Sequence, residues 1–312
     1  MNKQNKVSRR DFLKIISILG TTAVLAGWGI SRTKFMWQIG EFMALASLGG
    51  KAQKANDEKY DGKQITISYG DNPQQYVLVF PPIESAPQRD SIVFFAHGGG
   101  WNMGNPTQYR FVGRFFAQLG FPTILAGYRL TPDFQFPIQI DDTSASLHAG
   151  IQYFEQNNIY AKKIILGGHS AGAQLTSLLT YKENITVAER SLFSGLFCMS
   201  GPLDFSLCQS VGIKKLLDDY IGNLPNPEVA DPIFYADPEL SVSVLCIHGA
   251  QDPLVSVENS TSFAQKLNQG LVKRAQLNIL PDKYHSDTMD LFFETTDETR
   301  ILTDWIDLID AK

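Results

Sequence analysis

The stretch ILGGHSAG, residues 165–172, decides the fold because it joins a buried strand to a sharp turn. Its apolar start runs into GHSAG, residues 168–172, which fits the G-x-S-x-G pattern. Glycine on either side of the serine permits a strained turn between a strand and a helix, because no side chain then blocks their close approach. The pattern predicts that Ser170 is held out at the end of a strand.

Other near-continuous apolar runs flank this stretch and are typical of strands covered on both faces in a parallel sheet. The runs are residues 91–100, 121–130, 163–170, 195–201, 242–250 and 275–281. Two earlier runs, 64–70 and 74–82, are joined by turn residues and predict an antiparallel hairpin. Helix-like segments lie between the later runs, at residues 108–120, 140–158, 171–183, 257–270 and 299–310. The sequence therefore predicts an α/β fold, a mostly parallel sheet of about eight strands with helices on both faces.

Composition favours one large domain and excludes some partners. The 312 residues are 44% hydrophobic and 19% charged, which suits a single large core. A net charge of -5 gives no basic surface of the kind that binds phosphates, so we expect no nucleic-acid partner. Three cysteines allow at most one disulfide, and Cys198 and Cys246 lie in apolar runs where burial is expected.

The first 46 residues are predicted to be a signal or anchor with a linker. SRRDFLK, residues 8–14, precedes an apolar stretch, 15–30, that is shorter than the roughly 20 residues of a transmembrane helix. Arg9 and Arg10 resemble a twin-arginine signal, which implies a partner in the twin-arginine export machinery and a periplasmic or extracellular location. Cleavage and retention as a membrane anchor both remain open. The polar stretch 51–63 is read as a linker.

Reactive side chains follow four of the apolar runs, where ligands gather in a parallel sheet. Ser170 needs a neighbouring base, histidine has a suitable pKa, and an acid orients the histidine. The chain order Ser170, Asp252, His285 is that of an α/β-hydrolase triad. Alternative acids are Asp204, Asp282 and Asp287. The other histidines considered have other expected roles: packing or surface for His148, part of the turn for His169, and orientation of a turn for His248.

The glycine-rich stretch HGGGW, residues 97–101, does not fit the dinucleotide pattern G-x-G-x-x-G, because Met103 stands at the third glycine position. It fits the oxyanion loop of esterases and lipases better. We expect the backbone N–H groups of Gly98, Gly99 and Ala171 to hold the oxyanion, each donor being worth about 3 to 4 kcal/mol in the transition state.

Together these motifs resemble the esterases and lipases of the α/β-hydrolase superfamily that are related to hormone-sensitive lipase. YRLTPDFQFPIQIDD, residues 128–142, is similar to that group's Y-R-L-A-P-E-x-P-F-P-x-x-x-x-D segment. That group usually has aspartate where this chain has His169. GHSAGAQL with HGGGW also resembles kynurenine formamidases and feruloyl or acetyl-xylan esterases. The resemblance covers most of residues 64–310. We expect an α/β-hydrolase domain over residues 47–312, in which 201–240 is either a small lid or a long surface connection.

The sequence therefore predicts a serine hydrolase that cleaves short-chain, aryl or acetyl esters through an acyl-enzyme, with no cofactor and no metal. Hydrolysis of a formamide bond is the alternative, and a non-catalytic binding protein with this fold is a further one. Trp101 and Tyr128, with Phe134 and Phe136, are expected either to line the substrate pocket or to belong to the core.

Overall fold

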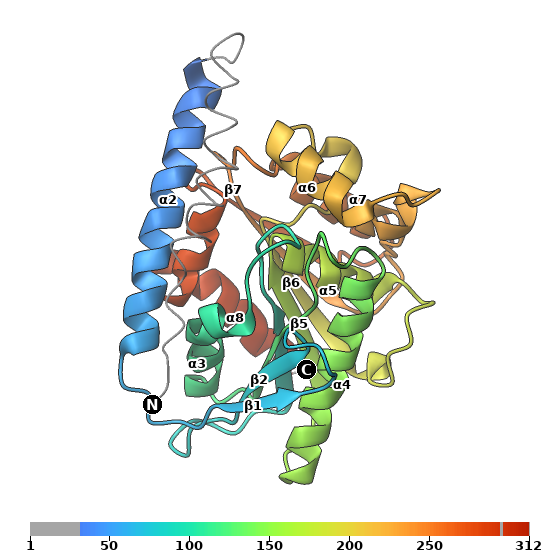
Figure 1. The fold of residues 1–312 in the computed structure, drawn as a ribbon. Helices are drawn as coiled ribbons and strands as arrows, with labels where there is room; N and C mark the ends of the chain where they lie inside the picture. Colours follow the sequence, from blue (N-terminus) through green and yellow to red (C-terminus); the bar gives the residue numbers. More distant parts are fainter. Residues whose placement is uncertain (1–31, 294–295, 312) are drawn as a thin grey trace.

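The computed structural model describes residues 32–293 and 296–311, which form an eight-stranded sheet between layers of helices (Figure 1). The expected twin-arginine segment lies outside the described residues. The strand order is β1-β2-β4-β3-β5-β6-β7-β8, antiparallel at β1-β2 and β2-β4 and parallel elsewhere. The strands are β1 (Ile65–Ser68), β2 (Tyr76–Phe80), β3 (Ser91–Ala96), β4 (Thr123–Ala126), β5 (Lys163–His169), β6 (Phe193–Met199), β7 (Ser243–Gly249) and β8 (Ala275–Leu280). The predicted fold class is confirmed.

The apolar runs are continuous because each central strand is covered on both faces. In β3, Ile92 and Phe94 enter one core cluster, whereas Val93 and Phe95 enter the other, as the alternation of side chains along a strand requires. One cluster contains residues of α4 (Ile138–Gln156), α5 (Ala171–Tyr181) and α7 (Glu258–Leu267). The other contains residues of α3 (Arg110–Gln118) and α8 (Asp297–Ala311). All five expected helices are therefore present.

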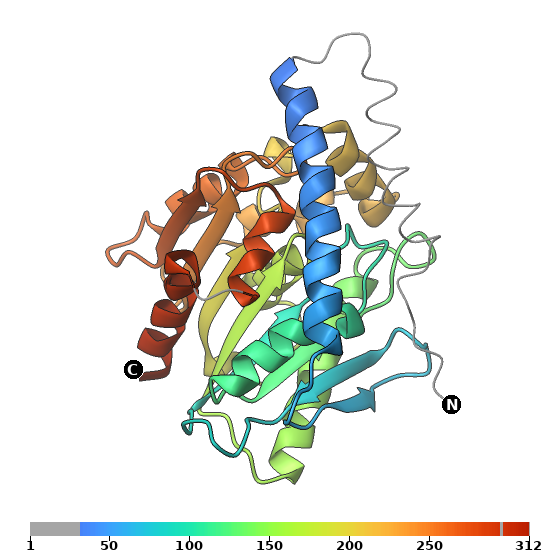
Figure 2. The same cartoon turned by 90° about the vertical axis from the view of Figure 1, so that its left-hand side faces the viewer.

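The N-terminal part of the described chain differs from the expected linker. Residues Arg32–Asp57 form the long helix α2, which lies along the molecule beside α3 (Figure 2). The expected boundary between residues 46 and 47 falls inside this helix. Residues 51–57 of the expected linker 51–63 also belong to it. Leu48, Ala52 and Ala55 pack against the core cluster of α3 and α8. Burial of one side of α2 outweighs its polar composition and its two adjacent glycines.

The segment 201–240 contains one helix, α6 (Val211–Ile221), and short 3-10 turns over Phe205–Leu207, Pro227–Ala230 and Pro232–Phe234. It packs on the HGGGW stretch, because a Cβ on Gly100 would lie 2.7 Å from Leu216 Cδ1. The rings of Trp101 and Tyr220 also stack, with 4.3 Å between their centroids. The remaining 3-10 turns are Pro106–Tyr109, Arg190–Leu192 and Ser286–Phe292, the last of which follows His285. A role for 201–240 as a lid stays a prediction.

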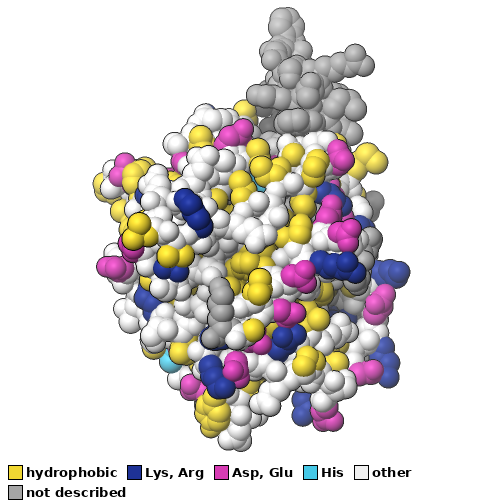
Figure 3. All heavy atoms as spheres, turned by 180° about the vertical axis from the view of Figure 1, so that it is seen from behind, with side chains coloured by type: hydrophobic (Ala, Val, Ile, Leu, Met, Phe, Trp, Pro, Cys, Tyr) yellow, Lys and Arg dark blue, Asp and Glu magenta, His cyan; other side chains and the backbone are white. Residues whose placement is uncertain are grey.

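The surface and the cysteines agree with an ordinary globular domain. Figure 3 shows that lysine and arginine side chains are interspersed with aspartate and glutamate on the face seen from behind. All three cysteines are buried and unpaired. Within residues 32–293 and 296–311, no helix combines the length and the apolar character that crossing a bilayer requires.

An ion pair between Arg129, just after β4, and Asp142, on α4, fixes the segment that joins them. Nε and Nη2 of Arg129 donate to the two Asp142 oxygens at 2.8 Å each, and the Arg129 backbone N–H donates at 2.9 Å. Gln75 adds a fourth hydrogen bond at 3.0 Å. These two residues are the arginine and the final aspartate of the segment 128–142, so that motif is explained by structure rather than by reaction chemistry.

We predict that Asp142→Ala lowers the free energy of unfolding by about 3 kcal/mol, because it leaves a guanidinium and two other donors without their acceptor. This predicted loss is at the low end for buried ion pairs, because the Arg129 side chain is 22% exposed. Urea unfolding followed by circular dichroism measures the change. Asp90→Ala is the control, because its pair with Lys162 is largely exposed, and a loss below about 1 kcal/mol is expected. Equal losses in the two variants would contradict the prediction.

Candidate active site

Ser170 lies in a tight turn between β5 and α5, as the G-x-S-x-G pattern predicts. Its φ of 53° and ψ of -121° are a strained conformation for a residue with a side chain. A Cβ on Gly168 would lie 2.3 Å from the carbonyl carbon of Gly172, and a Cβ on Gly172 would lie 2.0 Å from the Ala96 oxygen. Both glycines are therefore required by close backbone contact, which brings the start of α5 against the end of β3.

The structure brings Ser170, His285 and Asp252 together, although they are far apart in the sequence. Ser170 Oγ lies 2.9 Å from His285 Nε2, and His285 Nδ1 lies 2.6 Å from Asp252 Oδ2. An ionised carboxylate only accepts hydrogen bonds, so Nδ1 carries a proton and Nε2 is free to accept from the Ser170 hydroxyl. The arrangement can therefore remove the serine proton and orient the base that takes it.

Asp252 is held by hydrogen bonds at both of its carboxylate oxygens. Oδ1 accepts from the backbone N–H groups of Leu254 and Val255, each at 2.9 Å. Oδ2 is 3.1 Å from His248 Nε2, which is also 3.0 Å from the Val255 carbonyl. Because both neighbours of Nε2 are acceptors, His248 donates there and accepts at Nδ1 from Ser260. His248 therefore orients the acid, a more direct role than the turn residue expected from sequence.

Burial and charge act in opposite directions on the triad. Burial favours the neutral form of His285, but the charge and hydrogen bond of Asp252, together with the charge of Glu41, outweigh it and raise the pKa of His285. Burial also opposes ionisation of Asp252, yet His285 and His248 hold the pKa of that carboxyl well below its ordinary value. The lowered pKa favours Asp252 as a carboxylate, the form that stabilises an imidazolium at His285.

His169, the residue before the nucleophile candidate, is buried and neutral. Burial is the main cause that lowers the pKa of His169 to about 3, and the charge of His285 lowers it further. Nε2 of His169 is 3.2 Å from the His285 carbonyl oxygen, so it donates there and holds the backbone of the triad histidine. Sequence reasoning placed this residue in the turn but did not find that contact.

The HGGGW loop lies beside Ser170, since a Cβ on Gly98 would be 3.2 Å from Ser170 Cβ. The Gly98 N–H donates to the Tyr109 hydroxyl at 3.2 Å and is therefore already occupied. Gly99 has a φ of +123°, which favours glycine, and Ala171 is the first residue of α5, where a backbone N–H has no acceptor within the helix. The Ala171 N–H is thus better placed than that of Gly98 to receive developing negative charge, and the role of Gly99 stays a prediction.

Trp101 and Tyr128 lie in the core, which corrects the expectation that they line a substrate pocket. Their exposed fractions are 0% and 1%. The Trp101 indole N–H donates to Gln174 at 3.1 Å, and the Tyr128 hydroxyl donates to the His97 carbonyl at 2.8 Å. Tyr128 therefore supports the glycine-rich loop at its start, and Trp101 anchors the end of the loop to α5. Large aromatic side chains satisfy their polar atoms in this way when they are buried.

The alternative acids lie in other surroundings. Asp204 caps a 3-10 turn by accepting from the Ser206 backbone and hydroxyl, and Asp287 accepts from the Tyr284 backbone at 2.9 Å. Asp252 is the carboxylate that His285 contacts. Sequence reasoning did miss Glu41, a buried acid on α2 whose charge acts on His285. Its position inside a stretch read as a signal and linker gave no indication of it.

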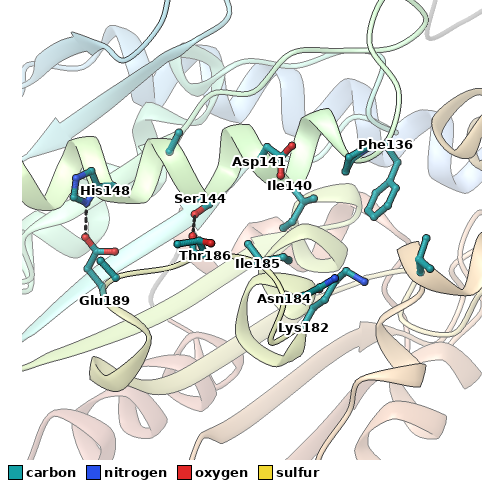
Figure 4. A pocket seen from close by; sticks show the side chains of 14 residues that line it. Phe136, Ile140, Asp141, Ser144, His148, Lys182, Asn184, Ile185, Thr186 and Glu189 are labelled. Atoms are coloured by element: carbon teal, nitrogen blue, oxygen red, sulfur yellow. Dashed lines mark hydrogen bonds and ion pairs between the residues drawn. The ribbon is translucent and has the colours of Figure 1, made fainter.

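A cavity of about 700 Å³ lies apart from these residues, between α4 and the segment 182–189 (Figure 4). Phe136, Ile140 and Ile185 contribute apolar side chains to its lining. His148 pairs with Glu189 at 2.7 Å across it. No residue of the candidate triad lines this cavity. Phe136 is thus the one predicted pocket aromatic that borders it, away from Ser170.

Comparisons with known proteins identify hydrolases as relatives of this chain. The sequence model of the BD-FAE family matches residues 79–267, which is more than half of the chain. Ethyl acetate hydrolase of Pseudomonas putida is 27% identical over 146 residues, 46% of this chain and 45% of that protein. Kynurenine formamidase of Danio rerio is 23% identical over 245 residues, 77% of this chain and 79% of that protein. The chain thus spans less than half of the Pseudomonas relative.

Among solved structures, esterase B from Lactobacillus rhamnosis (HN001) superposes with a TM-score of 0.71 at 20% identity. The superposition covers 89% of this chain and 95% of that one. A carbohydrate esterase from gut microbiota gives a TM-score of 0.68 at 18% identity, covering 82% of this chain and 99% of that truncated form. At these identities the likeness shows the fold, and the α/β-hydrolase fold expected from sequence is confirmed.

We predict that Gly172→Ala destabilises the protein by about 3 kcal/mol or more, because the new Cβ would lie 2.0 Å from the Ala96 oxygen and the backbone at the end of a buried central strand cannot move aside. Gly49→Ala is the matched control. Gly49 lies on α2, and a Cβ there would have no atom within 4 Å. Because alanine has the higher helix propensity, this replacement should raise the free energy of unfolding by about 0.5 to 1 kcal/mol. Thermal unfolding measures both changes. A Gly172→Ala protein as stable as the wild type would contradict the described turn.

Proposed function

Because the chain belongs to the BD-FAE family, we propose that it is a serine hydrolase that cleaves carboxylic esters through an acyl-enzyme. The single observation that carries the proposal is the hydrogen-bonded series in which Ser170 Oγ is 2.9 Å from His285 Nε2 and His285 Nδ1 is 2.6 Å from Asp252 Oδ2. The names of the relatives, which include an ethyl acetate hydrolase and several esterases, support the same reaction class.

In the proposed acylation step, Ser170 Oγ attacks the ester carbonyl carbon while His285 Nε2 takes the hydroxyl proton. The carbonyl bond gives its electron pair to the oxygen, and a tetrahedral oxyanion forms. When the oxyanion collapses, the bond to the alkoxy group breaks and the imidazolium protonates the leaving alcohol. Water then repeats the sequence, with His285 again as the base, and releases the carboxylic acid and free Ser170.

Two sets of groups stabilise the charges of this pathway. The N–H groups of Gly99 and Ala171 are proposed to hold the oxyanion, while Gly98, whose N–H donates to Tyr109, orders the loop. Asp252 stabilises the imidazolium and keeps its orientation through its hydrogen bonds to Leu254, Val255 and His248. Oriented donors of this kind act strongly in a buried site, because they need no reorganisation when charge develops.

Export is part of the same proposal. The Arg9-Arg10 pair and the apolar stretch 15–30 support transport by the twin-arginine machinery to the periplasm or the outside. Retention of that stretch as an anchor would place the hydrolase at a membrane surface.

We predict that the purified protein hydrolyses 4-nitrophenyl acetate and that Ser170→Ala lowers kcat by about 10⁴-fold or more, because no other group replaces the nucleophile. Unchanged circular dichroism would establish that the variant folds. Ser144→Ala is the control, since Ser144 lines the separate cavity and donates to the Thr186 carbonyl. Full activity of Ser170→Ala would end the proposal of an acyl-enzyme at this residue.

The second candidate function is hydrolysis of an aryl formamide, which the long alignment with a kynurenine formamidase favours. The same three residues can attack an amide carbonyl and protonate an amine leaving group.

A substrate panel separates the candidates: 4-nitrophenyl esters of rising acyl length, formylkynurenine and acetylated xylan. We predict the highest kcat/KM for the short acyl esters. A higher kcat/KM for formylkynurenine would instead support the formamidase, and activity confined to long acyl chains would contradict the proposal of short-chain specificity.

A further inference from the structure

A second buried carboxylate lies next to the triad, and it comes from the N-terminal helix rather than from the sheet. Glu41, on α2, has an exposed fraction of 1%. Its Oε1 accepts from the Ser286 hydroxyl at 2.6 Å, and its Oε2 accepts from the Ser286 backbone N–H at 3.3 Å. Ser286 directly follows His285, so this acid is tied to the backbone that carries the triad base.

The neighbours of Glu41 make it sensitive to the charge of the triad. Among the described residues, the titratable groups whose charges act on it are His285 and Asp252. Three further charged groups in this region have partners elsewhere. Asp290 pairs with Lys51 and Lys283, Asp287 accepts from the Tyr284 backbone, and Arg114 donates to carbonyl oxygens of Ala55 and Glu58.

We propose that Glu41 is a positioning residue for His285, a second carboxylate that stabilises the imidazolium from the side of α2 and fixes the loop through Ser286. This inference rests on the proposed hydrolase function, because the imidazolium is the species formed during acyl transfer. It also gives α2 a role in the reaction: a protein without the helix would retain Ser170, His285 and Asp252 but would lack this charge.

The protonation of Glu41 determines when the effect operates. Burial is the main cause that raises the pKa of Glu41 to about 7, Asp252 raises it further, and His285 and the hydrogen bonds of Ser286 act in the opposite direction. Glu41 is therefore mostly ionised at pH 8 and mostly protonated at pH 5.5. Only the ionised form favours the imidazolium, so the rate advantage from Glu41 grows as the pH rises through about 7.

The same shift has a consequence for stability whose sign is opposite to that of an ordinary ion-paired acid. The folded-state pKa of Glu41 lies above its ordinary value of 4.5, so ionisation favours the unfolded chain. Glu41 therefore lowers the free energy of unfolding progressively as the pH rises from 4.5 to about 7. A neutral residue of the same shape at this position does not lose stability over that range.

The test compares the wild type with Glu41→Gln, which keeps an acceptor for Ser286 but cannot ionise. We expect kcat of the variant to be about tenfold lower at pH 8, in the range of couplings between residues of one network, and within about threefold of the wild type at pH 5.5. The acidic limb of kcat/KM should also move to lower pH, because the pKa of His285 falls when the neighbouring charge is removed. If the ratio of the kcat of Glu41→Gln to that of the wild type is constant across pH, the proposal is overturned.

Two further variants separate positioning from simple anchoring of the helix. Lys51→Gln weakens a contact between α2 and Asp290 away from the triad, and it should leave the pH dependence of kcat unchanged. Ser286→Ala removes the hydroxyl that favours ionised Glu41, so the alkaline gain in rate should begin at higher pH. If Glu41→Gln does not fold, the proposal is overturned when the pH profile of kcat for Ser286→Ala is the same as that of the wild type.

A measurement without turnover distinguishes this inference from the proposed function. The His285 imidazole is titrated by nuclear magnetic resonance in Ser170→Ala and in Ser170→Ala with Glu41→Gln. We expect a lower pKa of His285 in the second protein, and equal values would overturn the role of Glu41. If Glu41→Gln lowers the pKa of His285 but the wild type hydrolyses no ester, the proposed hydrolase function is refuted. The interaction between Glu41 and His285 would still stand.

Discussion

The contact between the first turn of α5 and the end of β3 is the constraint on which the site depends. The Cβ position of Gly172 is 2.0 Å from the Ala96 oxygen, so only a residue without a side chain allows the helix to begin there. This contact forces Ser170 into its strained backbone conformation between β5 and α5. It also fixes the distance from Ser170 to the loop that follows β3, and thereby joins the proposed nucleophile and the proposed oxyanion donors in one unit.

Sequence could predict the parts of the molecule whose signals are local. The run SIVFFA shows burial on both faces, because adjacent residues such as Phe94 and Phe95 must enter opposite clusters. Chain order then limited the triad to His285, since it follows Asp252. Packing between segments that are distant in the chain has no comparable signal in the sequence. The stacking of Trp101 on Tyr220 depends on where α6 lies, and that is a tertiary property.

Helix α2 shows why the remaining part could not be predicted. Its stretch near Ala44 has small residues suited to a cleavage site, and its later half is polar with two glycines, so composition favoured a signal and a linker. The helix forms because Leu48, Ala52 and Ala55 find an apolar surface that includes α3 and the 3-10 turn Ser286–Phe292. Tertiary burial of this kind commonly overrides weak intrinsic propensity, and it is invisible until the partner surface is known.

The segment 285–286 accepts a hydrogen bond from β5 and donates hydrogen bonds to α2. These bonds explain how a buried group of ionisable residues is tolerated. His169 donates to the His285 carbonyl, whereas the Ser286 N–H and hydroxyl donate to Glu41. The hormone-sensitive-lipase group that the sequence motifs resemble usually has an aspartate at the position of His169. Here an acid at that position would join Asp252 and Glu41 around a single imidazole, and ionising a third buried carboxyl would be costly. A neutral His169 holds the same backbone without adding charge. The charges of two carboxyl groups with different pKa values then act on His285: the pKa of Asp252 is held well below its ordinary value, and that of Glu41 is raised to about 7.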